Sequence, residues 1–268
     1  MSNRYFVPHP IDGEAASLSG GEAHHLVHVM RAKVGDEVVL FDGSGAEFPA
    51  RIKRIERSRV WLAVLGRQEV YRELPVGLTL GVCLPKGDRQ RWLVEKAVEL
   101  GVRRLVPLQT ARSVVVRSPA RLHRLVRVVV EASKQCGRNR LMEIASPHRF
   151  QDFVRCGHGD SLRLLADPSA RDAPDRWFGA VDRSTVQVLV AIGPEGGFTA
   201  EELRLAAQSG WRLVNLGPRM LRIETAAVVL AALAAQAVQN CWARADRHDR
   251  LPGPDSTATG PEMTLLSG

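Results

Sequence analysis

One segment combines the residue types of a ligand-binding loop with a suitable position in the chain. GPEGGF, at residues 193–198, follows an apolar run at 186–193 and precedes a helix expected at 199–210. In a parallel α/β sheet, ligands bind in the loops that follow the carboxyl ends of the strands. The glycines of GPEGGF allow a ligand to approach the backbone closely. Because Glu195 would repel phosphate, a zwitterionic or cationic ligand fits this loop better than a polyphosphate. A tight strand-to-helix turn with no ligand would show the same pattern.

A second segment of the same kind is LGPRMLRIETAA, at residues 216–227. It follows a strand expected at 211–217 and leads into an apolar helix expected at 224–242. Because the two loops occupy successive strand-to-helix positions, we expect them to lie side by side and to form one backbone-lined pocket. Glu224, Thr225 and the amino terminus of the helix would close that pocket.

Several other classes of site are not indicated. The GPEGGF loop contains no G-x-G-x-x-G and is followed by no Gly-Lys-Ser/Thr, so it is neither a Rossmann fingerprint nor a P-loop. No zinc or redox spacing relates the four cysteines, Cys83, Cys136, Cys156 and Cys241, and we expect no metal. The amino terminus lacks an apolar signal core, and the most apolar stretch, 226–238, is too short to span a bilayer. We therefore expect a cytoplasmic protein with no membrane partner.

The elements that must position these loops fall into two regions. Residues 1–72 contain short strand-like runs separated by turn signals, which predicts a small β-barrel. A helix is expected at 20–33, with Leu26, Val29 and Met30 sharing one face. From residue 73 to 244 strands and helices alternate, which predicts an α/β domain with a mainly parallel sheet. Strands are expected at 78–84, 103–110, 162–167, 186–193 and 211–217, and helices at 88–101, 121–136, 199–210 and 224–242.

Three local signals refine this organisation. Asp88 has the position of an N-cap residue, and Thr199 with Glu202 has the spacing of a capping box. Residues 245–268 are rich in Pro, Gly, Ser and Thr and show no periodicity, so we expect a disordered tail.

The positive charge of the chain is concentrated in one segment. The formal net charge is +8, and residues 76–150 alone carry 15 basic and 5 acidic residues. Such a concentration is typical of a face that contacts nucleic-acid phosphates, although solvated helix faces would give the same pattern. The candidate phosphate contacts are Lys86, Arg89, Arg91, Arg112, Lys134, Arg138 and Arg140.

The two loops, together with further blocks in the same order, resemble the RsmE family of SPOUT methyltransferases, which modify N3 of a uridine in 16S ribosomal RNA. The other blocks are LPKGDRQRWLVEKAVELGV (84–102), LQTARSVV (108–115), EASKQCGRNR (131–140), LLADPSA (164–170), RYFV (4–7) and the segment 20–45. The resemblance covers residues 4 to about 242. It implies a PUA-like barrel followed by a parallel α/β domain with a C-terminal deep trefoil knot. It also implies S-adenosyl-L-methionine as cofactor and S-adenosyl-L-homocysteine as product. The protein would be a homodimer that acts on 16S rRNA in the small ribosomal subunit.

The resemblance also implies roles for individual residues. Cofactor contacts are expected at Leu165, Ile192, Gly193, Pro194, Glu195, Gly196, Gly197, Leu216, Gly217, Leu221, Arg222, Ile223, Thr225 and Ala226. Ile223 stands where the family usually has Thr. Since the reaction places negative charge on the uracil oxygens and removes a proton from N3, the site needs a base, or a cation that stabilises the anion.

We expect Arg222 or Arg219 to stabilise that charge, and Glu195 or Glu224 to accept the proton or to orient an arginine. Arg4 is expected to reach across to the site of a partner subunit. An ion pair between Arg222 and Glu224 that only shapes the loop is the competing interpretation.

Two other functions remain open from the sequence. One is 2′-O-methylation of ribose by the same kind of fold, although the Asn-x-Ser pattern associated with that branch is absent from the last loop. The other is an RNA-binding or assembly protein without catalysis, which would use the barrel and the basic segment. Binding of S-adenosylmethionine would argue against the second.

Overall fold

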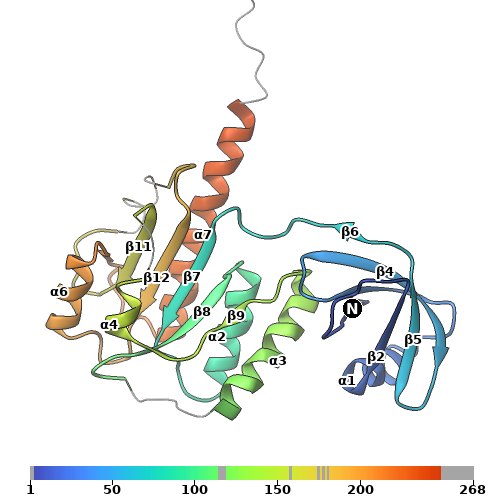
Figure 1. Ribbon diagram of the computed structural model, residues 1–268. Helices are drawn as coiled ribbons and strands as arrows, with labels where there is room; N and C mark the ends of the chain where they lie inside the picture. Colours follow the sequence, from blue (N-terminus) through green and yellow to red (C-terminus); the bar gives the residue numbers. More distant parts are fainter. Residues whose placement is uncertain are drawn as a thin grey trace, which may run out of the picture.

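The protein contains two sheets, each with its own hydrophobic core, joined by an extended segment (Figure 1). The computed structural model describes residues 3–113, 119–156, 159–173, 176, 179 and 181–248, with backbone alone at 119–123 and 244–248. Residues 249–268, which make up most of the expected tail, lie outside the described residues.

The first sheet is built from short strands of the amino-terminal region. Its strands are β1 (Arg4–Phe6), β2 (Ala15–Ser19), β3 (Glu37–Phe41), β4 (Ala46–Ile55), β5 (Arg59–Val64) and β6 (Gln68–Glu69). They lie in the order β1-β3-β4-β5-β2, with β6 against β4. Alternate residues of β4, such as Ala50 and Ile52, are fully buried, because successive side chains of a strand point to opposite faces. The curled sheet thus encloses the first core, as the sequence predicts.

The helix expected at 20–33 is shorter and changes type. It comprises α1 (Gly20–His24) and a single π-helical segment, η1 (His25–Val29). A π turn holds more residues than an α turn and therefore rotates the following side chains. Leu26 is fully buried, but Val29 is 52% exposed, so the expectation that these two side chains share one buried face is wrong.

The second sheet carries the two glycine loops. Its strands are β7 (Gly77–Val82), β8 (Arg104–Gln109), β9 (Glu143–Ile144), β10 (His148–Arg149), β11 (Ser161–Ala166), β12 (Gln187–Ile192) and β13 (Arg212–Val214). They lie in the order β10-β8-β7-β12-β11-β13, with β9 against β8. Every pairing in this sheet is parallel, which confirms the predicted α/β class. The knot that the resemblance implies stays a prediction.

Helices cover both faces of the second sheet. They are α2 (Asp88–Glu99), α3 (Pro119–Cys136), α4 (Phe150–Phe153), α6 (Ala200–Gln208) and α7 (Ile223–His248). The helices α2, α3 and α7 contribute to the larger core on one face, whereas α4 and α6 cover the other face (Figure 1). All parallel strands therefore end at a single edge, where their carboxyl-terminal loops meet.

Two helix ends differ from expectation. Gly87 is the N-cap of α2 and Asp88 is its first helical residue, with no side-chain cap. The last helix continues through His248, so residues 245–248 are helical rather than part of a tail. No helix-breaking residue occurs before Pro252.

The last helix is the most apolar element of the chain. By length and composition alone, Ile223–Ala243 could cross a membrane, a criterion that core helices of soluble proteins also meet. Leu230 and Ala234 of this helix are fully buried in the core of the second sheet. The helix therefore serves as a core element that begins directly after the second glycine loop.

Candidate functional site

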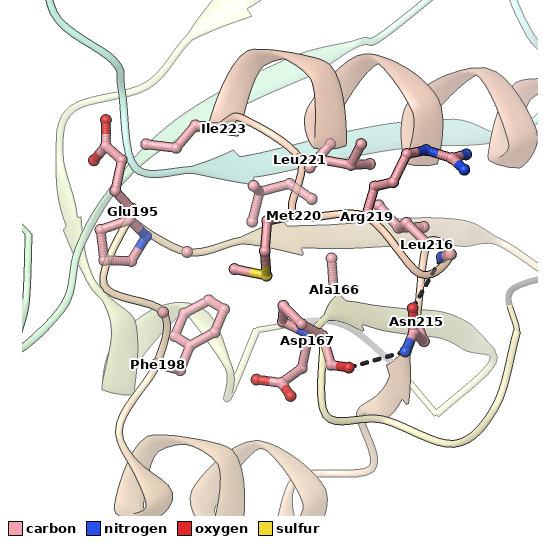
Figure 2. A pocket seen from close by; sticks show the side chains of 17 residues that line it. Ala166, Asp167, Glu195, Phe198, Asn215, Leu216, Arg219, Met220, Leu221 and Ile223 are labelled. Carbon is pink, nitrogen blue, oxygen red and sulfur yellow. Dashed lines mark hydrogen bonds between the residues drawn. The ribbon is translucent and has the colours of Figure 1, made fainter.

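A cavity lies where β11, β12 and β13 end (Figure 2). We call it the first cavity. It is lined by Ala166, Asp167, Pro168, Ile192, Gly193, Pro194, Glu195, Gly197, Phe198, Asn215, Leu216, Gly217, Arg219, Met220, Leu221, Ile223 and Ala226. Both glycine loops therefore contribute to one site, as the sequence predicts.

The loops do not follow neighbouring strands, however. The strand β11 pairs with β12 on one side and with β13 on the other, so it separates them. The expected side-by-side placement is wrong for this reason, and Ala166–Pro168, at the carboxyl end of β11, form part of the wall.

Asn215 holds two of these loops together. Its side-chain amide donates hydrogen bonds to the carbonyls of Pro168 and Ala170, at 2.9 and 3.1 Å. Its side-chain oxygen accepts a hydrogen bond of 2.9 Å from the backbone N–H of Gly217. Figure 2 shows this residue between the two segments. The cavity wall is therefore fixed before any ligand binds.

The wall of the first cavity suits a partly apolar ligand that carries hydroxyl or cationic groups. Gly197 and Gly217 have φ angles of +66° and +109°, and a Cβ at either would meet no atom within 4 Å. Because both line the cavity, such a Cβ would point into its open space. Much of the remaining wall is apolar, whereas the carboxylates of Asp167 and Glu195 offer acceptors to hydroxyl or cationic groups.

The capping box predicted for α6 is present, and it also anchors a second segment. The Thr199 side chain accepts from the backbone of Glu202, and the Glu202 carboxylate accepts from the backbone of Thr199. The other Glu202 oxygen accepts from the backbone N–H of Ala111 at 2.9 Å. In the same segment, Arg112 donates to the carbonyl of Gly196 at 2.7 Å. The loop after β8 is thus tied to the GPEGGF loop.

A second cavity adjoins the first at the same edge of the sheet. We call it the second cavity. It is lined by Cys83, Leu84, Pro85, Lys86, Pro107, Leu108, Gln109, Arg112, Ser113, Pro147, Pro194, Glu195 and Ile223. Three of these residues, Pro194, Glu195 and Ile223, also line the first cavity. The two cavities therefore share a boundary.

Cys83 is the only thiol in the wall of the second cavity. Burial raises the pKa of this thiol to about 12, despite a hydrogen bond to Thr110 that acts in the opposite direction. A thiol with so high a pKa stays neutral at physiological pH, and the thiolate is the nucleophilic form. Cys83 therefore serves as an apolar wall residue and not as a nucleophile.

The catalytic candidates are distributed unevenly over these cavities. Glu195 is exposed and lines both, and Arg219 lines the first. Arg222 is exposed, and it belongs to the lining of neither cavity. Glu224 is buried and lies 3.7 Å from Arg89 of α2. The alternative ion pair between Arg222 and Glu224 is therefore wrong, because Arg89 takes that place.

A family of known proteins matches this arrangement. The family model described as an RNA methyltransferase domain matches residues 72–235, and the one described as an RNA methyltransferase PUA domain matches residues 18–65. This chain belongs to the RNA methyltransferase family. Since the first match covers more than half of the chain, the relationship extends well beyond the two glycine loops.

Named relatives support the same assignment. The chain is 31% identical to ribosomal RNA small subunit methyltransferase E of Bacillus subtilis, over 86% of this chain and 93% of that protein. It is 32% identical to the Synechocystis protein of the same name, over 87% and 77%. The resemblance to the RsmE family is thereby confirmed.

Solved structures agree with the fold. The Neisseria gonorrhoeae ribosomal RNA small subunit methyltransferase E, bound to S-adenosyl methionine, is 29% identical with a TM-score of 0.79, covering 89% of this chain and 98% of that one. A Legionella pneumophila protein in complex with its bound cofactor is 32% identical with a TM-score of 0.77, covering 90% and 98%.

Most residues expected to contact the cofactor of this methyltransferase line the first cavity. Leu165, Gly196, Arg222 and Thr225 do not. Leu165 is fully buried, one position before a lining residue. The sequence missed Ala166, Asp167, Pro168, Phe198, Asn215 and Met220. The first three belong to LLADPSA (164–170), one of the blocks that resemble the RsmE family, so this block could have indicated them.

The expected phosphate contacts occupy three different surroundings. Lys86 and Arg112 are exposed at the second cavity. On α2, Arg91 is exposed and pairs with Glu95, whereas Arg89 faces Glu224. The remaining three, Lys134, Arg138 and Arg140, lie at the junction between the barrel and the methyltransferase domain.

The buried cations of this junction are used for structure. Lys134 is buried and pairs with Glu22 of α1 at 2.9 Å. Arg138 is 4% exposed, pairs with Glu73 and donates to two backbone carbonyls of the α2 region. The expectation that Lys134 and Arg138 present charge to phosphates is therefore wrong. A buried cation keeps its charge only with such partners.

The barrel side of the junction contains Arg4. Its guanidinium pairs with Glu47 and donates to Asn139, and Arg72 donates to the same Glu47 carboxylate. Arg140 lies against Gly45 of the barrel. Arg4 is thus held within its own chain, which contradicts the expectation that it reaches a partner subunit.

Proposed function

We propose that this chain transfers a methyl group from S-adenosylmethionine to N3 of a uridine in 16S rRNA of the small ribosomal subunit. The observation that supports this most directly is the pair of adjoining cavities at one edge of the parallel sheet. The relatives named ribosomal RNA small subunit methyltransferase E support the substrate, and the cofactor-bound Neisseria relative supports the methyl donor.

The first cavity would hold the cofactor. The segments around Gly193, Gly197 and Gly217 would contact it through the backbone, and Leu216 and Leu221 would pack against its base. Asp167 and Glu195 would accept hydrogen bonds or face its positive charge. Among the residues that the structure describes, no group of three or more His, Cys, Asp or Glu side chains could hold a metal.

The chemistry assigns different tasks to the residues of the boundary. When bound, S-adenosylmethionine supplies a methyl group whose bond to sulfur breaks as the bond to N3 forms, with the electron pair remaining on sulfur. Glu195 would accept the proton of N3, and its position in the wall of both cavities supports this role. Ile223, which is 5% exposed and lines both cavities, would exclude water from the boundary.

Arg222 is the proposed cation for the uracil oxygens. Its side chain has no hydrogen-bond or ion-pair partner in the part of the chain that the structure describes. A guanidinium keeps its charge at any working pH, and a free one next to Ile223 can turn toward a bound base. Glu224 would then act through Arg89, by fixing α7 against α2.

The remaining features of the proposal concern assembly and location. Residues 1–72 would form an RNA-binding barrel, and residues 73–244 would form the catalytic domain. We expect a homodimer in the cytoplasm, where small ribosomal subunits are modified.

Nucleoside mass spectrometry of 16S rRNA tests the proposal. Subunits from a strain lacking the gene should contain no N3-methyluridine at the target, and the purified chain with S-adenosylmethionine should restore it. If 2′-O-methyluridine appears instead, the methylated position is the ribose 2′-oxygen and not N3. If the chain binds subunits but binds no cofactor and forms no methylated nucleoside, the alternative of a non-catalytic RNA-binding or assembly protein is favoured.

A further inference from the structure

The second cavity has a position that the cofactor does not explain. The first cavity lies at the ends of β12, β11 and β13, whereas the second lies beyond β12, at the ends of β7 and β8. Cys83–Lys86 follow β7, and Pro107–Gln109 end β8. A methyl group that leaves the first cavity across the shared boundary therefore arrives in the second.

Two polar side chains of the second cavity are free to bind a ligand. Within the described part of the chain, the side chains of Lys86 and Gln109 make no hydrogen bond or ion pair. Arg112, by contrast, is already held by the carbonyl of Gly196. The cavity thus offers one unpartnered amide and one unpartnered ammonium. A polar group partly removed from water is stabilised by a ligand that satisfies it.

The remaining wall suits a flat, weakly polar ring. It consists largely of the rings of Pro85, Pro107 and Pro147 with Leu84 and Leu108. Its volume is about 260 Å³, many times the roughly 10–15 Å³ that a cavity needs to hold one water. That volume accommodates a single pyrimidine, and the exposed Lys86 and Arg112 mark the side where a phosphate backbone would pass.

The loop that completes the cavity is held in place without a ligand. The Ser113 hydroxyl accepts from the backbone N–H of Thr110 at 2.9 Å and donates to its carbonyl at 3.1 Å. The bond from Ala111 to Glu202 fixes the same turn from outside. A site held in this way needs little further ordering when it receives a base.

We propose that the second cavity receives the target uracil after it leaves the RNA stack, and that Gln109 binds its polar edge. This inference rests on the proposed function. The side-chain N–H group of Gln109 would donate to a carbonyl oxygen of uracil, and Lys86 would lie toward the phosphates. A base must leave its stack before chemistry can occur at its edge, and single-stranded RNA is read through such edges.

Substitutions of Gln109 separate a base contact from a wall contact. Gln109→Leu removes the amide, and Gln109→Glu keeps the shape but replaces the donor with an acceptor. Gln208→Leu is the matched control, because Gln208 is exposed on α6 and lines neither cavity. Each variant is assayed with small subunits from the deletion strain for kcat and KM, with cofactor affinity by calorimetry and melting temperature alongside.

We expect Gln109→Leu to lower kcat/KM for subunits by about tenfold, and Gln109→Glu by roughly a hundredfold, because a carboxylate repels the uracil anion. Cofactor affinity and melting temperature should stay within about twofold and a few degrees of wild type, and Gln208→Leu should match wild type throughout.

Three results would overturn the inference. Equal activity of both Gln109 variants and wild type would place the base elsewhere. A parallel loss of cofactor affinity would assign the second cavity to the cofactor. Equal losses in Gln109→Leu and Gln109→Glu, with a lowered melting temperature, would make Gln109 a structural residue. If wild type itself forms no N3-methyluridine, the proposed function fails first and this inference falls with it.

Discussion

Glu202 offers the sharpest test of how the fold shapes the first cavity. The residue is 8% exposed, and its carboxylate accepts two backbone N–H groups, those of Thr199 at 2.8 Å and of Ala111 at 2.9 Å. The first bond caps α6, and the second holds the turn that precedes Arg112. Glu202→Ala removes both acceptors at once.

The size of the effect follows from those two bonds. A buried N–H group that loses its acceptor costs about 1–3 kcal/mol. Ala111 is exposed, so water replaces part of its lost bond and its cost lies near the lower end. We therefore expect a total loss of about 2–4 kcal/mol. At roughly 2–4 °C for each kcal/mol in a domain of this size, the melting temperature should fall by about 4–16 °C.

The matched control is the neighbouring residue. Glu201 is also in the first turn of α6, but it is exposed and has no partner within the residues that the structure describes. Glu201→Ala loses only the interaction with the helix dipole, about 0.3–1 kcal/mol. Urea unfolding of both variants and of wild type, with cofactor affinity by calorimetry, separates the two contributions.

Cofactor affinity should fall in Glu202→Ala alone, because the loosened turn carries Arg112, which donates to Gly196 of the GPEGGF loop. If Glu202→Ala and Glu201→Ala unfold within about 0.5 kcal/mol of each other, the reasoning is refuted.

Three further predictions concern the cavity, the chemistry and the domain junction. Gly197→Ala should reduce cofactor affinity by at least about tenfold in calorimetry, because the added methyl group enters the cavity. Gly20→Ala is the control: Gly20 has a φ of +56° and open space around it, so the variant carries the same backbone strain of about 1–2 kcal/mol. Its cofactor affinity should be unchanged. Arg222→Ala should lower turnover about 10²- to 10³-fold with little change in cofactor affinity; activity near wild type in a methylation assay would remove Arg222 from the chemistry. Burial alone would raise the pKa of Glu47, but hydrogen bonds from its two arginine partners outweigh burial and hold the pKa below its ordinary 4.5. The resulting stabilisation is present above pH 4.5 and is lost as pH falls through the folded pKa, so Glu47→Gln should flatten the acid limb of stability measured by urea unfolding from pH 6 to pH 3; an unchanged acid limb would contradict this.

The elements that could be predicted are those with strong local signals. The strands β7, β8, β11 and β12 are continuous apolar runs bounded by breaking residues, and such runs become buried parallel strands. The capping box at Thr199 and Glu202 depends on two residues at fixed spacing. Both glycine loops could be placed because each follows such a strand.

What could not be predicted depends on the order of strands in space. Nothing local in the sequence places β11 between β12 and β13, so the contribution of Asp167 to the first cavity was missed. Similarly, periodicity does not show which distant carboxylate meets a given cation. Lys134 and Arg138 look like residues of a basic surface in the sequence. Docking of the barrel brings Glu22 against Lys134, and the segment just before β7 brings Glu73 against Arg138.

The basic segment therefore has two separate uses. At its carboxyl-terminal end, buried cations join the barrel to the catalytic domain, and a buried cation there is compensated by the carboxylate beside it. At its amino-terminal end, Lys86 has no partner among the residues that the structure describes, and Arg112 is exposed, both at the second cavity. Charge left uncompensated attracts phosphate, whereas paired charge does so far less. Uncompensated positive charge of the segment therefore lies where the proposed base would enter, whereas Lys134 and Arg138 at its carboxyl-terminal end are each compensated by a carboxylate.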